Sequence, residues 1–97
     1  MFLKIHRASD GQTIVAVCDK ELINTTITDG DLTISITDSF YGDRAVPEEE
    51  VVRALKDADN ANIMGERSVT LAVDKGFIAR DSCMMIGNIP HAQVFRL

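Results

Sequence analysis

The sequence predicts a single α+β domain, with a largely antiparallel sheet and two consecutive helices packed on one face of that sheet. Three observations support this prediction: apolar, β-branched stretches at both ends of the chain, two stretches of helical periodicity between them, and turn-forming residues at the boundaries. Ninety-seven residues are too few to give two domains a core each. The 45% of apolar residues indicates a chain that folds rather than a disordered one.

The first two strands are predicted over residues 2–7 and 13–18. Both stretches are rich in the apolar and β-branched side chains that favour strands. The segment between them contains Asp10 and Gly11, which suit the two central positions of a tight turn. The chain is therefore expected to open with a β-hairpin.

A two-residue turn at that point also fixes the register of the hairpin. It sets Ile5 opposite Ala16, so that residues whose numbers sum to 21 face each other. In this register Cys18 lies on the apolar face with Ile5, and His6 lies on the other face, which is expected to be partly exposed.

The next segment predicts a short helical turn, a bend and a third strand. Residues 19–24 suit a helical turn, and the threonines after them suit a bend. From Asp31 to Thr37, apolar residues alternate strictly with Thr and Ser, which is the pattern of a strand with one exposed face. A turn is expected at residues 40–43.

Two helices are predicted after that turn. The first begins at Pro47, because proline suits the first turn and three glutamates follow at the positive end of the helix dipole, and it ends near Ala58. The second runs from about Ala61 to Lys75, with Gly76 as its C-terminal stop.

The last predicted strands, Cys83 to Ile86 and His91 to Arg96, would complete the sheet. They are separated by residues 87–90, which contain a glycine, an asparagine and a proline.

The charge and hydropathy of the chain disfavour two classes of partner. The net charge is −5 and the basic residues form no run, which opposes direct nucleic-acid binding. The longest apolar run, Ile14 to Cys18, is too short to cross a membrane, and charges interrupt the N-terminal segment where a signal peptide would be apolar. We therefore expect a cytoplasmic protein, and dimerisation stays open.

No motif of high specificity assigns a reaction, because the chain lacks a Gly-rich phosphate loop and the HExxH, GxSxG and CxxC patterns. The residues His6, Cys18, Cys83 and His91 match zinc in type and number. However, the predicted hairpin register places His6 and Cys18 on opposite faces. No metal and no cofactor is predicted.

One weaker constellation remains. The expected start of the second helix carries free backbone amides that could hold an anion. His91 follows Pro90, and Gln93, two residues further on, projects from the same face of the strand, so both side chains could meet that helix start. The alternative is structural: a helix cap, and a strand-end histidine bonded to the backbone. The candidate binding residues are Asn62, Gly65, Glu66, Arg67, His91 and Gln93.

These stretches also carry a family resemblance. The segments 57–66 and 89–93, together with the opening strands, resemble the archaeal family called domain of unknown function 424. One departure is Asn88-Ile89, where Gly-Val is expected before Pro-His-Ala-Gln. The resemblance implies a small archaeal cytosolic protein whose biochemical role is unassigned, so it implies no catalytic residues.

Two hypotheses about function follow. The first is a binding or adaptor module, not an enzyme, that serves translation or RNA-processing machinery and binds a protein or ribonucleoprotein through residues 62–67 and 90–93. The second is a small enzyme or small-molecule binder in which His91 acts as an acid or base and Glu66 orients it.

Overall fold

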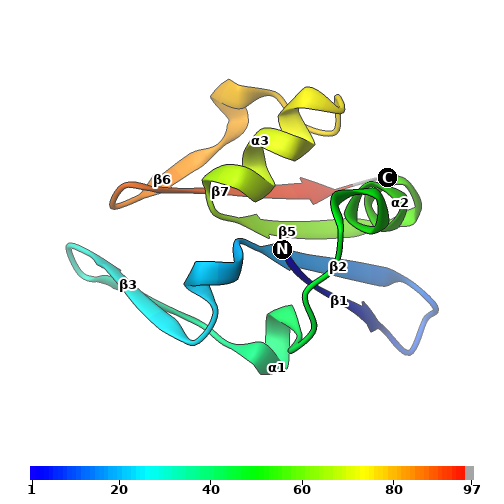
Figure 1. Ribbon diagram of the computed structural model, residues 1–97, viewed down its shortest axis with the longest axis horizontal. Coiled ribbons are helices and arrows are strands. Elements are labelled where there is room, and N and C mark those ends of the chain that lie inside the picture. Colours follow the sequence, from blue (N-terminus) through cyan, green and yellow to red (C-terminus); the bar gives the residue numbers. More distant parts are fainter. Residues whose placement is uncertain (96–97) are drawn as a thin grey trace.

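The computed structural model describes residues 1–95 (Figure 1). Short 3₁₀ turns at Lys20–Leu22 and Arg80–Ser82 interrupt the connections between its elements. The strands and helices, in chain order, are β1 (Phe2–Arg7), β2 (Thr13–Cys18), β3 (Thr25–Asp29), β4 (Leu32–Ile36), α1 (Asp38–Tyr41), α2 (Glu48–Asp57), β5 (Asn60–Met64), α3 (Glu66–Asp74), β6 (Met84–Ile86) and β7 (Ile89–Phe95).

Five of these strands form one sheet in the order β1-β2-β5-β7-β6, and β3 and β4 form a separate hairpin. The pair β2 and β5 is parallel, whereas the other three pairs of the sheet are antiparallel. The predicted α+β fold with a largely antiparallel sheet is confirmed.

The sheet has a core on each face. On one face, α2 and α3 pack over the strands, as the sequence predicted, and bury Val15, Val17, Val51, Leu55, Ile63 and Val69. On the opposite face, α1 and the β3–β4 hairpin cover a second core of Ala16, Cys18, Ile36, Tyr41, Met64 and Ile86. The second face was expected to be partly exposed, but much of it is covered. Within residues 1–95, no helix has the length and the apolar composition needed to cross a membrane.

The largest error of the sequence prediction concerns β5. The second helix was expected to begin at about Ala61, but residues 60–64 form the central strand between β2 and β7. Hydrogen-bonded pairing with a strand on each side outweighs the helical spacing of the apolar side chains. Distant segments supply that pairing, so the local sequence does not reveal it. Gly65 then takes a φ of +112°, which no helix allows, and α3 begins only at Glu66.

The register of the first hairpin is shifted by one residue from the prediction. Partners sum to 20, as for Leu3 and Val17. The reason is the loop 8–12, which uses five residues and closes with a 2.8 Å hydrogen bond from the amide N of its first residue to the carbonyl O of its last. His6 and Cys18 therefore lie on the same face of the hairpin, contrary to the prediction.

The remaining elements divide between successes and smaller errors. The helical turn after Cys18, the strand β4, the helix α2 and the two last strands are confirmed. The expected threonine-rich bend is the strand β3, and the expected turn at residues 40–43 is largely the short helix α1. Gly76 ends α3 as predicted, with a φ of +81°. Arg96, the predicted end of the last strand, lies outside the described residues.

Candidate functional site

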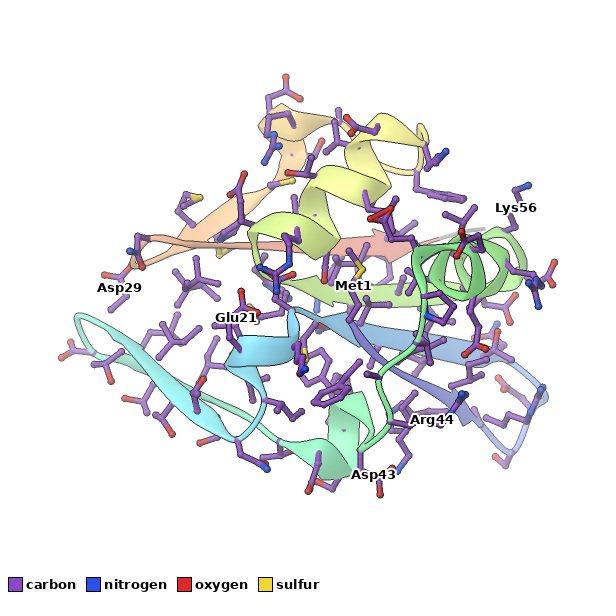
Figure 2. The ribbon with its side chains drawn as sticks, viewed as in Figure 1. Met1, Glu21, Asp29, Asp43, Arg44 and Lys56 are labelled. Carbon is purple, nitrogen blue, oxygen red and sulfur yellow. The ribbon has the colours of Figure 1, made fainter. Side chains whose placement is uncertain are left out.

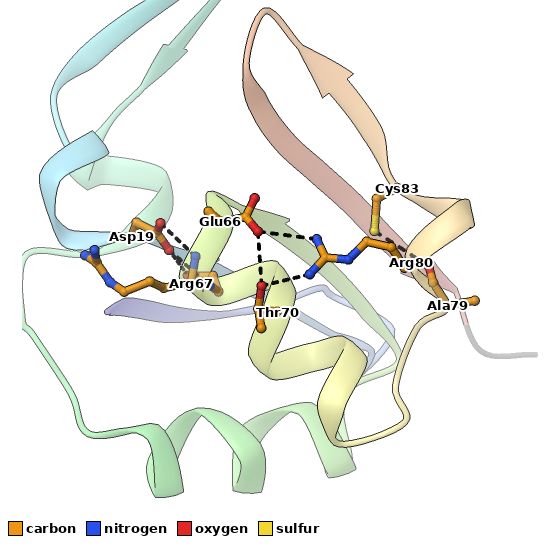
Figure 3. Close-up of polar contacts among 8 residues, drawn as sticks. Asp19, Glu66, Arg67, Thr70, Ala79, Arg80 and Cys83 are labelled. Atoms are coloured by element: carbon orange, nitrogen blue, oxygen red, sulfur yellow. Dashed lines mark hydrogen bonds and ion pairs between the residues drawn. The ribbon is translucent and has the colours of Figure 1, made fainter.

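The N-terminal end of α3 holds a carboxylate that belongs to the chain itself (Figure 3). The backbone amide of Arg67 donates to Oδ2 of Asp19 at 3.0 Å. The amide and the hydroxyl of Ser68 donate to Oδ1 at 2.8 and 2.7 Å. Asp19 is only 3% exposed. Amides at the start of this helix therefore do hold a carboxylate, as the sequence predicted, but it is the carboxylate of Asp19 and not that of a ligand.

Gly65 completes this arrangement, and we call Asp19, Gly65 and the amides of residues 67 and 68 the Asp19 junction. A Cβ atom on Gly65 would lie 2.4 to 2.7 Å from the carboxyl atoms of Asp19, so only glycine fits. The amide of Gly65 donates to the carbonyl of Pro90 at 2.9 Å. The two distant segments of the predicted site do meet at the backbone.

The exposed charges around the junction pair with one another. Arg67 forms an ion pair with Glu21, which lowers the pKa of Glu21 and raises that of Arg67. Glu66 accepts a 3.3 Å hydrogen bond from the Thr70 hydroxyl and lies 3.6 Å from Nη1 of Arg80 (Figure 3). The charged side chains at the start of α3 therefore already have partners within the chain.

The other predicted residues face the opposite side of the sheet. Antiparallel pairing of β5 with β7 sets Asn62 opposite Gln93, and His91 opposite a methionine of the second core. Asn62 is a strand residue, not a helix cap, and its Oδ1 accepts a 2.6 Å hydrogen bond from the Tyr41 hydroxyl. Glu66 belongs to the helical face, so it does not orient His91. That the six predicted residues bind a ligand stays a prediction.

His91 differs from its neighbours because its Nε2 atom is buried and no residue that the structure describes forms a hydrogen bond with it. Burial lowers the pKa of the imidazole, so His91 stays neutral at lower pH than a free histidine. The expectation of a ring bonded to the backbone is not met at this nitrogen.

A hollow of about 680 Å³ lies between β1 and α2, and we call it the β1–α2 hollow. Its apolar floor is formed by Leu3, Ile5 and Val15. Ile5 is 44% exposed, which is unusual for an isoleucine in a sheet. None of these residues was predicted to bind a ligand, because strand alternation indicates the face of a side chain but not whether a helix covers it.

Charged side chains line the walls of this hollow. Arg44, which lies between α1 and α2 (Figure 2), donates to Glu50 at 3.0 Å. Arg7 and Arg53 form no ion pair with any residue that the structure describes. With Asp57 included, the lining carries three positive and two negative charges, a net +1 in a chain of net −5. Half of the six arginines of the chain are gathered here.

The residues that match zinc in type are His6, Cys18, Cys83 and His91. Across residues 1–95, no three or more His, Cys, Asp or Glu side chains gather where they could hold a metal ion. His6 and Cys18 share a face of the hairpin, so its register does not separate them as predicted. His6 instead stacks on Phe40, with its Nε2 2.8 Å from the Phe40 carbonyl. Burial raises the pKa of Cys18 to about 12, so its thiol stays protonated.

Comparisons with known proteins agree with the resemblance noted in the sequence. None of the curated proteins matches the chain. The fold is similar to the crystal structure of an uncharacterized conserved protein from Methanopyrus kandleri, with a TM-score of 0.79 and 23% identity over 99% of this chain and 93% of that one. The family described as "protein of unknown function (DUF424)" matches residues 6–97. The chain therefore belongs to the DUF424 family, whose function is unknown.

Proposed function

We propose that this protein is a binding module that holds an acidic, extended segment of a partner protein in the β1–α2 hollow. The observation that supports this proposal most is that Arg7 and Arg53, which form no ion pair with a described residue, lie beside an apolar floor in which Ile5 is exposed. The function resembles the binding module expected from the sequence, but it uses a different site.

The apolar floor favours a ligand with aliphatic side chains. Helix α2 packs against β2 and leaves part of β1 uncovered, which is why Ile5 is exposed whereas Val15 is buried. Covering Ile5 with a partner side chain would remove apolar surface from water, at about 25 cal/mol for each Å². A hollow of this size falls within the range of ligand pockets.

The charges favour a carboxylate over a nucleic acid. Guanidinium groups bind carboxylates through two parallel hydrogen bonds, and no residue in the described part of the chain forms an ion pair with Arg7 or Arg53. A nucleic-acid backbone would bring many phosphates close to Glu50 and Asp57, and to a protein of net charge −5. A short acidic peptide brings only the charges that the two arginines can neutralise.

The position of β1 favours an extended segment. This strand forms one edge of the sheet, and among residues 1–95 its only outward pairing is an isolated bridge between Phe2 and Ala45. Gly42 lies against the backbone of Leu3, so the part of β1 with which an added strand could pair is residues 5–7. Strand addition is a common mode of peptide recognition. We define the partner by this chemistry alone, since neither the fold nor the comparisons point to translation or RNA processing.

The test uses a fluorescent octapeptide, Thr-Leu-Thr-Glu-Thr-Leu-Thr-Glu, which presents Leu and Glu on the same face of an extended chain. We expect the full-length protein to bind it, and the Arg53→Gln variant to bind at least about tenfold more weakly. Lys20→Gln removes the same charge at an exposed position on the 3₁₀ turn after β2, and it should bind like the unchanged protein.

Two results would contradict the proposal. One is an affinity that falls equally in Arg53→Gln and Lys20→Gln, which would indicate only a general effect of net charge. The other is an absence of binding at millimolar peptide by an unchanged protein that is folded by circular dichroism.

A further inference from the structure

A row of side chains crosses the sheet on the face opposite to α2 and α3. Residues that pair directly across neighbouring strands point to the same face. His91 pairs with Met64 of β5 on one side and with Met84 of β6 on the other. The Cβ atoms of such pairs lie about 4.5 to 5.5 Å apart, so side chains as long as methionine can reach one another. Two methionines therefore neighbour one histidine on the same face of the sheet.

The imidazole offers this row a nitrogen atom that could act as a metal ligand. Nε2 of His91 is buried and has no hydrogen-bond partner among residues 1–95. A neutral imidazole nitrogen in that condition is a metal ligand as well as a hydrogen-bond acceptor. A bound ion would satisfy an atom that the protein itself leaves unpaired.

The three donors differ in burial in a way that allows an ion to enter. Met64 is 1% exposed and packs in the second core, whereas Met84 is 61% exposed on the edge strand β6. The methionine side chain is long, unbranched and flexible, so Met84 can move over His91 without disturbing the backbone. The site would have one fixed thioether, one fixed imidazole and one movable thioether.

The chemistry of the donors selects the ion. Thioethers are soft ligands that favour Cu(I), whereas Mg²⁺ and Ca²⁺ require oxygen ligands. None of these three residues supplies a carboxylate. We propose that Met64, His91 and Met84 form a binding site for Cu(I), independent of the β1–α2 hollow on the other face of the sheet.

Cys18 lies next in the same row, opposite Met64 in the parallel pair of β2 and β5. Its thiol is buried and stays protonated at neutral pH, so we do not include it among the ligands. Substituting it would disturb the second core, so the test leaves it unchanged.

The test measures how the full-length protein competes for Cu(I) with a coloured chelator, in the absence of oxygen. A Cys83→Ser background removes the other thiol, which is only partly buried. We expect one equivalent of Cu(I) to transfer to the protein, and Met84→Leu and His91→Gln to weaken its binding at least about tenfold.

The chain offers a matched control in Met85. It adjoins Met84, is 54% exposed, and points to the opposite face because side chains alternate along a strand. Met85→Leu should bind Cu(I) like the background protein. Equal losses in the Met84 and Met85 variants, or no transfer to the folded background protein, would overturn the proposal.

A second readout keeps the proposal testable if a variant folds poorly. Ag(I) is a redox-stable substitute for Cu(I), and NMR of ¹³C-labelled methionine methyl groups in the Cys83→Ser protein reports each thioether separately. We expect Ag(I) to shift the methyl signals of Met64 and Met84 and to leave that of Met85 in place. Shifts confined to Met84 and Met85 would show loose binding at the exposed edge and overturn the proposed site.

Discussion

The Asp19 junction and the β1–α2 hollow use charged side chains in opposite ways. At the junction, the Asp19 carboxylate is buried and accepts three hydrogen bonds from residues 67 and 68. In the hollow, Arg7 and Arg53 are exposed and form no ion pair within the described part of the chain. The Asp19 carboxylate stabilises the fold, whereas the two arginines are available to a partner.

This difference shows why a motif that suggests a site can be structural. A helix N-terminus binds anions well, and this one binds an anion from its own chain. Removing a buried, fully bonded group leaves its partners unsatisfied, whereas removing an exposed charge costs little stability. Substitutions at the junction should therefore lower the free energy of unfolding, and those in the hollow should lower only binding.

Gly65→Ala should have the largest effect on stability. The added Cβ would meet the Asp19 carboxylate, and φ at this position is +112°. We expect a loss of about 3 kcal/mol or more in the free energy of unfolding, measured by urea denaturation. Gly76→Ala is the control, with a φ of +81° but no atom within 4 Å of the added Cβ, and should cost only about 1 kcal/mol. Equal losses would show that the junction is not tightly packed.

Asp19→Ala should rank second. It leaves the amide and hydroxyl of Ser68 and the amide of Arg67 without their acceptor, at a cost of about 2 to 3 kcal/mol by the same measurement. Glu21→Gln, which alters the exposed pair with Arg67, should change the urea midpoint very little. A midpoint as low in the Glu21 variant as in the Asp19 variant would contradict this account.

A smaller effect is expected from pH at His91. Desolvation places its folded-state pKa below the ordinary value of 6.5 that an unfolded chain would show. The unfolded state therefore binds more protons, and the free energy of unfolding should fall as pH drops below about 6.5, until the folded-state pKa is passed. His91→Gln should flatten this dependence between pH 7.5 and 5. A folded-state pKa of 6.5 or higher for His91, measured by NMR titration, would refute this prediction.

The smallest effect on stability is expected in the hollow. Arg53→Gln should leave the free energy of unfolding within about 0.5 kcal/mol, because its side chain is exposed and forms no ion pair with a described residue. Thermal denaturation compares the stability of Arg53→Gln directly with that of Asp19→Ala. A loss as large as that of the Asp19 variant would assign Arg53 a structural role.

The sequence predicted best those elements that local signals specify. The alternation in β4, the proline and glutamates at the start of α2, and Gly76 after α3 each act within a few residues. The strand β5 could not be predicted in this way, because its conformation depends on pairing with β2 and β7.

The candidate sites were harder to predict for the same physical reason. Asp19 and Ser68 are 49 residues apart, and no local pattern indicates that they meet. The sequence predicted that the segment carrying His91 and Gln93 could meet the start of the second helix. It did not predict the face on which His91 projects, since that depends on the strand state of residues 60–64. Arg7 and Arg53 likewise come together only through the packing of α2 beside β1.

The most direct test of the central claim is a charge-swap measurement in the hollow. The affinity of the Leu/Glu octapeptide is compared with that of its Leu/Lys counterpart, for the unchanged protein and for the Arg7→Glu/Arg53→Glu variant. If these two arginines bind the ligand, the unchanged protein prefers the glutamate peptide and the variant prefers the lysine peptide. The same preference in both proteins would show that the hollow is not the binding site.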